Sequence, residues 1–151
     1  MLALAGGLLV PPSGMSSHEA KARFPPRLSL STKGDELWTK RGSFCTKTLC
    51  ADGPARETRR TLRVCPGNRI QVAIRAHSKQ LAIFESESNL RYARAHQRSP
   101  QRWFFGAGDR PPTGTRLTLE LFVRYDRAKT GFIDAFFYGT IKRAESCSAM
   151  E

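Results

Sequence analysis

Long apolar runs are absent from the sequence, and so are the common signatures of catalysis. No segment reaches the roughly 20 consecutive apolar residues that cross a bilayer, so no transmembrane helix is predicted. The sequence also has no Gly-x-Ser-x-Gly elbow, no Walker motif and no complete dinucleotide-binding motif. It therefore predicts neither catalytic residues nor a cofactor, and it favours a protein that is not an enzyme.

Cysteine is scarce, with four in 151 residues, which is far below the density of a small disulfide-bonded scaffold. We therefore expect free or buried thiols in a reducing setting, with a disulfide from Cys50 to either Cys45 or Cys65 as the alternative. Together with His77, the first three cysteines would supply four zinc donors, but their spacing matches no recognisable zinc finger. No metal site is predicted.

Acidic residues are few, and this imbalance is the strongest signal in the composition. The chain has 25 basic residues, of which 18 are arginine, against 13 acidic residues, for a net charge of +12. Residues 56–116 contain thirteen basic and four acidic residues, a net charge of +9, whereas residues 117–151 are neutral. A charge excess of this size predicts an anionic partner.

Alternation of apolar and polar residues predicts most of the fold. Residues 117–125 alternate almost perfectly, and residues 132–141 are rich in aromatic and β-branched side chains, so we expect an antiparallel hairpin over residues 116–142. Three shorter strands predict a meander over residues 61–84. Its middle strand places Arg69 and Arg75 on the face opposite its apolar side chains.

One short helix is predicted near residues 89–98, because Ser88 or Asn89 can cap it and Pro100 stops it. The apolar burst at residues 103–105 fits either an edge strand or a plug in the core. The expected fold class is therefore α+β or mainly β, with a small antiparallel sheet.

The ends of the chain differ in composition from its middle. Residues 1–34 hold basic residues and serines with a single acid, which predicts a disordered or targeting tail of the kind that directs proteins to the mitochondrion. Cytoplasm and nucleus are the alternative locations. Residues 35–145 are expected to form a single small β-rich domain, followed by a disordered C-terminus at residues 146–151.

Two arginine clusters are the candidate binding site. On the predicted helix, Arg91, Arg94 and Arg98 would share one face, and guanidinium groups bind phosphate through paired hydrogen bonds. Tyr92, His96 and Trp103 lie among these arginines and would stack on unpaired bases. The candidate residues are Arg56, Arg59, Arg60, Arg63, Arg91, Tyr92, Arg94, Arg98, Arg102 and Trp103.

These features predict a basic module that binds RNA, another polyanion or an acidic protein surface, as a peripheral subunit of an organellar ribonucleoprotein would. The basic middle segment beside a neutral, foldable hairpin is the observation behind this hypothesis. Two alternatives remain open: a self-assembling, capsid-type β protein with a basic tail, and an open reading frame without a selected activity. The sequence leaves the oligomeric state undecided.

Overall fold

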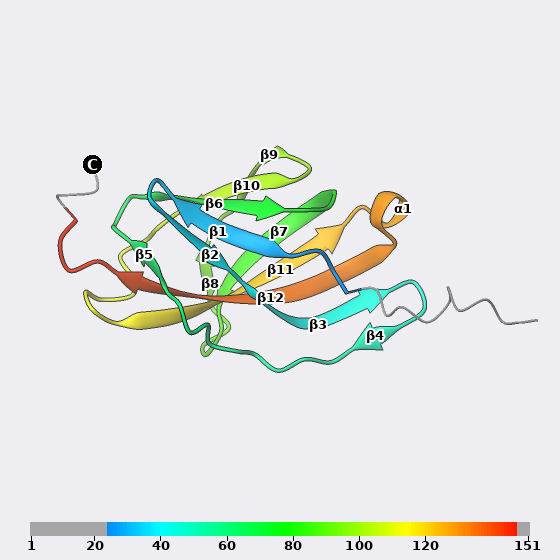
Figure 1. Ribbon diagram of the computed structural model, residues 1–151, viewed down its shortest axis with the longest axis horizontal. Coiled ribbons are helices and arrows are strands. Elements are labelled where there is room, and N and C mark those ends of the chain that lie inside the picture. The colour runs from blue at the N-terminus through cyan, green and yellow to red at the C-terminus, as the bar shows by residue number, and fades with distance from the viewer. Residues whose placement is uncertain (1–23, 148–151) are drawn as a thin grey trace, which may run out of the picture.

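The computed structural model describes residues 24–147, which form two β-sheets that face each other (Figure 1). Sheet A has the strand order β2-β1-β6-β10-β9, with the bounds Asp35–Trp38, Leu28–Thr32, Arg69–Ile74, Arg102–Gly106 and His96–Ser99. Sheet B has the strand order β4-β3-β12-β11-β7-β8, with the bounds Cys50–Ala51, Lys40–Thr46, Phe132–Arg143, Arg116–Tyr125, Ser78–Glu85 and Arg91–Ala93. β5 (Leu62–Val64) pairs in parallel with the end of β12, and all other pairings are antiparallel.

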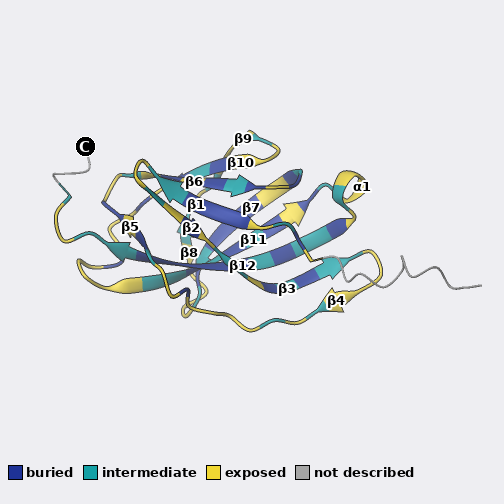
Figure 2. Ribbon diagram, viewed as in Figure 1, coloured by how far each residue is buried: buried dark blue, intermediate teal, exposed yellow. Residues whose placement is uncertain are grey.

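The described residues share one hydrophobic core between the two sheets. Figure 2 marks the buried residues along the strands that contribute to it. Successive side chains of a strand point to opposite faces of the sheet. Every second residue of β6 and β10 in sheet A is therefore buried in the core, and every second residue of β11 in sheet B packs into the same core from the other side. The mainly β class predicted from alternation is confirmed. The described residues also contain no helix long and apolar enough to span a membrane.

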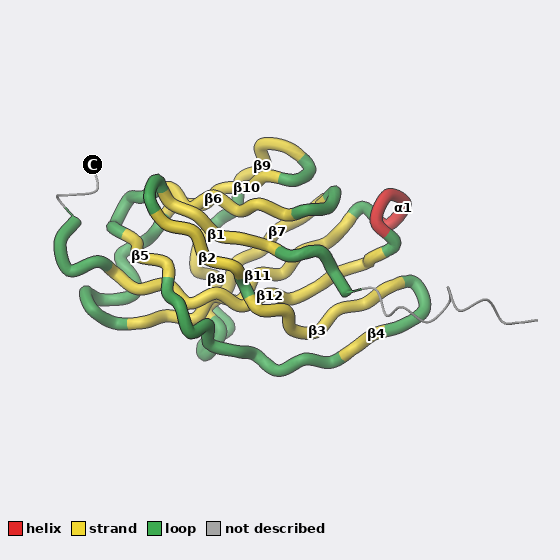
Figure 3. Tube along the Cα trace, in the orientation of Figure 1, coloured by secondary structure: helices red, strands yellow, loops and turns green. Residues whose placement is uncertain are grey.

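The hairpin predicted over residues 116–142 is confirmed. β11 and β12 pair antiparallel from Arg116 opposite Lys142 to Arg124 opposite Asp134. Their connection contains α1 (Arg127–Thr130), which is the helical element in the described residues (Figure 3). At the N-terminus of α1 the Asp126 side chain accepts hydrogen bonds from backbone amides. The helix ends at Gly131, which has the left-handed conformation with φ of 77°.

The meander predicted over residues 61–84 is wrong, although its three strands exist. β5 pairs with β12, β6 lies in sheet A between β1 and β10, and β7 lies in sheet B between β11 and β8. The chain therefore crosses from one sheet to the other after β6. Alternation identifies a strand but not its partner, because either sheet of a sandwich offers the same buried face.

The helix predicted near residues 89–98 is also wrong, because this segment forms β8 and β9. A tight turn precedes β8, with a hydrogen bond of 2.9 Å from the Asn89 amide to the Glu85 carbonyl and a positive φ of 58° at Asn89. β8 then pairs with the edge of β7. An isolated helix of about ten residues is marginal in water, so sheet pairing outweighs the helical spacing of the arginines.

Both predicted tails contain ordered residues: a strand lies within the first, and a disulfide-bonded cysteine lies within the second. Residues 28–32, inside the tail predicted over 1–34, form β1, whereas residues 1–23 and 148–151 lie outside the described residues. The expectation of free thiols is wrong, since all four cysteines form disulfides, Cys45 with Cys50 and Cys65 with Cys147. Sequence spacing cannot reveal the second bond, because its residues are 82 positions apart and meet only when β12 pairs with β5.

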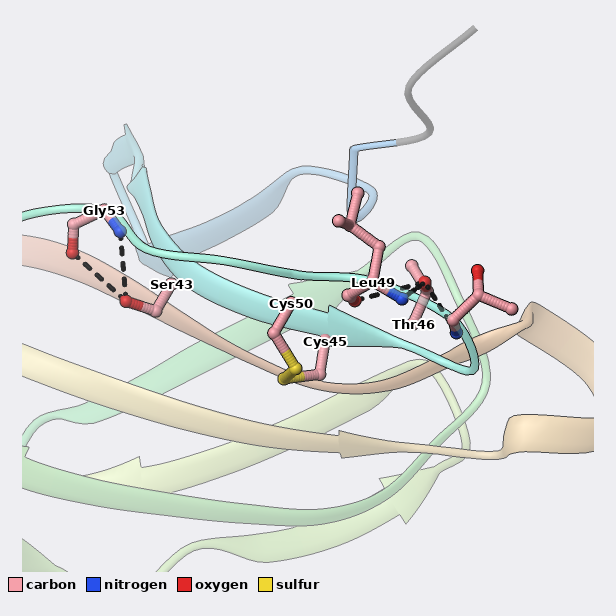
Figure 4. Close-up of a disulfide and its surroundings, with 7 residues drawn as sticks. Ser43, Cys45, Thr46, Leu49, Cys50 and Gly53 are labelled. Atoms are coloured by element: carbon pink, nitrogen blue, oxygen red, sulfur yellow. Dashed lines mark hydrogen bonds between the residues drawn. A yellow bond between two sulfur atoms is a disulfide. The ribbon is translucent and has the colours of Figure 1, made fainter. Parts of the chain in front are cut away.

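A close backbone approach beside the first disulfide gives a testable expectation. The amide of Gly53 donates to the Ser43 hydroxyl at 3.0 Å, and that hydroxyl donates to the Gly53 carbonyl at 3.2 Å (Figure 4). A Cβ atom at Gly53 would lie 2.8 Å from the Gly42 carbonyl carbon, which is backbone and cannot rotate away. We expect Gly53→Ala to lower the free energy of unfolding by about 1–3 kcal/mol in urea titrations.

Gly34→Ala is the matched control for this substitution. Within the described part of the chain, a Cβ atom at Gly34 meets nothing within 4 Å, so that variant should unfold at the same urea concentration as the original protein. Equal midpoints for the two variants would contradict the expected clash at Gly53.

Candidate functional site

The outward face of sheet A carries a group of cationic side chains that strand alternation places together. In β6 the side chains of Ile70, Val72 and Ile74 are buried in the core, so Arg69 at the start of the strand points to solvent. Arg75, directly after β6, is exposed in the same alternation. The sequence pattern of this strand had already separated these two arginines from the apolar face.

The neighbouring strands add two more arginines. In β10 the buried residues are Trp103 and Phe105, so Arg102 lies on the outward side and is exposed. β9 pairs with β10 at the sheet edge and contributes Arg98. We call the outward surface formed by Arg69, Arg75, Arg98 and Arg102 the cationic face.

Aromatic rings support these guanidinium groups. The ring of Phe104, on the outward side of β10, has the guanidinium carbon of Arg69 at 4.4 Å and that of Arg98 at 5.4 Å from its centroid. The His96 ring stacks on the same phenyl ring at 5.2 Å. Such contacts hold a cation in place without neutralising it, because the attraction comes from the electron-rich face of the ring.

The same arrangement recurs at the other edge of sheet A. The guanidinium carbon of Arg75 lies 5.2 Å from the centroid of the Trp38 ring, which is 39% exposed at the end of β2. Glu36 points outward from the same strand and adds a negative charge to this side of the sheet. Within residues 24–147, no carboxylate lies within ion-pairing distance of any of the four arginines of the cationic face.

A pocket of about 540 Å³ opens at one end of the cationic face. Arg69 and Arg98 line it together with Lys33 from the turn between β1 and β2. The other lining residues are neutral and polar: Ser31, Thr32, Asn68 and Gln71. The pocket thus combines three cations with hydroxyl and amide groups, and no carboxylate of residues 24–147 belongs to its lining.

The structure separates the arginines that the sequence grouped on one helix. Arg98 and Arg102 lie on the cationic face, although they reach it from paired strands rather than from a helix. Arg91 belongs to β8 at the edge of sheet B, and Arg94 lies in the connection between β8 and β9. The predicted cluster is therefore only half present on one surface.

Of the three aromatic residues predicted to stack on bases, His96 is exposed and lies against Phe104 on the cationic face, whereas Trp103 and Tyr92 do not offer a free ring. Trp103 is 7% exposed and donates a hydrogen bond of 2.8 Å from its indole nitrogen to the Ser78 hydroxyl. Tyr92 donates to the Arg110 carbonyl at 2.9 Å and accepts from the Gly108 amide at 3.2 Å, and burial raises its pKa. Both residues stabilise the fold and do not present a ring face for a ligand.

The second predicted cluster lies around β5. Arg56, Arg59 and Arg60 are exposed in the segment before this strand, and Arg63 is exposed within it. Arg60 lies 3.7 Å from a carboxylate oxygen of Asp35 at the start of β2, so it is the one arginine of this cluster with an ion pair in the described part of the chain.

A second basic pocket adjoins β5. Arg63 lines this pocket of about 520 Å³ together with Lys142 and Arg143 from the end of β12. Glu145 shares its lining, so its positive charge is partly offset. The cluster around β5 thus forms a surface of its own.

The zinc arrangement considered for the cysteines is ruled out, because Cys45, Cys50 and Cys65 are all in disulfides and have no thiolate to offer. Across residues 24–147 no group of three or more histidine, cysteine or acidic side chains is placed to hold a metal ion. No family model, curated protein or solved structure matches the chain. The function is therefore argued from the site itself.

Proposed function

We propose that the protein is a non-catalytic module that binds a polyanion through the cationic face of sheet A. The observation that carries this proposal is the set of four exposed arginines on adjacent strands or directly after one of them. None of the four has a carboxylate partner among the described residues. A cluster of unneutralised like charges on a rigid sheet destabilises the free protein. The charged, non-bridging oxygens of phosphate or sulfate esters remove that repulsion by accepting charge-assisted hydrogen bonds.

The support from the aromatic rings makes the surface suited to this role. Arg69 and Arg98 rest against Phe104, and Arg75 rests against Trp38, so their guanidinium groups have fewer conformations to lose on binding. A pre-oriented cationic surface binds a polymer through many similar contacts and attracts it over long range. RNA, the polyanion predicted from the sequence, has the required charge.

The two disulfides bear on the compartment in which this module works. Structural disulfides persist in oxidising compartments and are rare in the cytosol and nucleus. We therefore favour an oxidising compartment. A mitochondrial address would depend on residues 1–23, which lie outside the described part of the chain.

Neutralising three arginines tests the proposal. We expect Arg69→Gln, Arg98→Gln and Arg102→Gln, combined in one variant, to weaken binding of both single-stranded RNA and a heparin oligosaccharide, measured by fluorescence anisotropy. Each RNA phosphate that the variant leaves unneutralised should reduce the slope of log K against log salt by about 0.7, hence by about 2 for the triple variant.

A control with the same reduction in charge separates this surface from net charge. Arg56→Gln, Arg91→Gln and Arg127→Gln, combined, change three exposed arginines that lie away from the cationic face. This variant should retain most of the affinity and the salt slope. If it binds as weakly as the face variant, or if neither polymer binds at low salt, the proposal is wrong.

A further inference from the structure

We infer that the polyanion bound by this module is a sulfated polysaccharide, with one sulfated sugar seated in the pocket lined by Lys33, Arg69 and Arg98. This inference rests on the proposed function and adds the class of polymer. Three features of the described residues carry it: the lining of the pocket, the state of the aromatic rings on the cationic face, and the disulfides.

The lining of the pocket matches a sulfated sugar in both charge and polarity. Its three cations are suited to sulfate oxygens, because guanidinium and ammonium groups donate several hydrogen bonds to a tetrahedral anion. The neutral residues Ser31 and Gln71 lie opposite each other on β1 and β6 and present a hydroxyl and an amide on the outward side. Such groups pair with the hydroxyls of a sugar ring, which both donate and accept.

Asn68 adds a donor to this set. Its side-chain oxygen is already engaged, since it accepts a hydrogen bond of 2.9 Å from the Cys65 amide. The NH₂ group of the same side chain can then only donate, which again suits sulfate or hydroxyl oxygens. The volume of about 540 Å³ lies in the range of small-molecule sites, about 300–1,000 Å³, and accommodates a sugar residue with its substituents.

The aromatic rings on this surface are poorly placed to bind nucleobases. Proteins that bind single-stranded RNA offer open ring faces on which bases stack. Phe104 instead contacts two guanidinium groups and the His96 ring, and Trp38 has Arg75 over it. Phe104 and Trp38 therefore hold cations in position, which favours recognition of a polymer by its charge, and His96 has one of its two faces against Phe104.

The disulfides agree with this choice of polymer. Both bonds favour an oxidising compartment, where sulfated polysaccharides are common and RNA is not. The cationic face would then meet its ligand at a cell surface or in the extracellular matrix.

Three probes of similar total charge distinguish the possible ligands: a heparin octasaccharide, a desulfated and N-acetylated heparin oligosaccharide lengthened to match its charge, and single-stranded RNA. Binding of each to the full, disulfide-bonded chain is measured by competition anisotropy at about 0.15 M salt, where weak long-range attraction is screened. We expect the octasaccharide to bind at least about tenfold more tightly than either of the others.

Neutral substitutions in the pocket test the seat of the sugar without changing the charge. Ser31→Ala combined with Gln71→Ala should weaken octasaccharide binding about three- to tenfold, whereas RNA binding and its salt slope should stay unchanged. Gln80→Ala combined with Thr113→Ala, at exposed positions away from the pocket, is the matched control and should bind the octasaccharide normally.

The outcomes separate this inference from the proposed function. If RNA binds as tightly as the octasaccharide, or if desulfation has no effect, the polysaccharide inference is wrong while polyanion binding stands. Polyglutamate of matched charge serves as an additional competitor in the same assay. Equally tight binding of polyglutamate would overturn the inference as well, because it would show selection by charge alone. Failure of every probe to bind, even at low salt, would overturn both.

Discussion

Replacing Cys65 and Cys147 together by alanine is expected to lower the free energy of unfolding by about 4–5 kcal/mol, measured by urea titration under non-reducing conditions. The bond joins residues 82 positions apart, so removing it frees a long loop in the unfolded chain. It also releases the chain after β12 from the chain after β5, where the Ala144 amide donates to the Val64 carbonyl at 3.0 Å. Because small domains are stable by only about 5–15 kcal/mol, this change should leave the protein near the limit of folding.

The other disulfide provides the control. Cys45 and Cys50 are only 5 positions apart, and the bond closes a short turn between β3 and β4. Cys45→Ala combined with Cys50→Ala should therefore lower the free energy of unfolding by about 2 kcal/mol. Equal effects of the two double variants would show that loop length does not govern the contribution of these bonds.

Phe105→Ala should produce the next largest decrease, about 3–5 kcal/mol in the free energy of unfolding. The side chain of Phe105 is completely buried, and the residue lies opposite Ile70 across the β6–β10 pair. Its ring meets the Tyr92 ring edge-on, with 6.1 Å between the two ring centroids. Truncation removes its buried area and leaves a cavity that both sheets line. Urea unfolding followed by circular dichroism measures the effect.

Phe104→Ala, one residue earlier, tests which side chains of β10 face the core and which face solvent. Its ring lies on the outward side beside two arginines, so its removal should cost less than about 1.5 kcal/mol. If Phe104→Ala destabilised the protein as much as Phe105→Ala, the assignment of inward and outward residues in β10 would be wrong. The cationic face would then lose its basis.

Local patterns in the sequence predicted the parts of the fold that depend on neighbouring residues. The β11–β12 hairpin could be predicted because both strands are long and a short connection joins them. The outward position of Arg69 and Arg75 followed from the alternation in β6. Pairing between distant strands could not be predicted, since β6 has its partners in β1 and β10 and not in its sequence neighbours.

The sequence predicted part of the candidate site. It grouped the arginines on a helix, whereas in the structure paired strands bring two of them together. The spacing of Arg91, Arg94 and Arg98 fits a helix, but the segment is drawn into two strands that belong to different sheets. Arg98 and Arg102 still share a surface, because β9 and β10 pair side by side. Lys33 joins the same pocket from the turn after β1, a proximity between distant parts of the chain that spacing alone does not encode.

The position of β12 has a consequence for how the protein is made. Among the described residues this strand is the last in sequence, yet β11, β3 and β5 all pair with it, so it occupies the middle of sheet B. During synthesis, sheet B cannot form completely until the chain has been made as far as residue 143. Until then the apolar side chains of the earlier strands remain exposed to solvent. Synthesis that stops short of β12 would leave sheet B incomplete and yield a substrate for chaperones and proteases, and the bond between Cys65 and Cys147 can form only after β12 has been made.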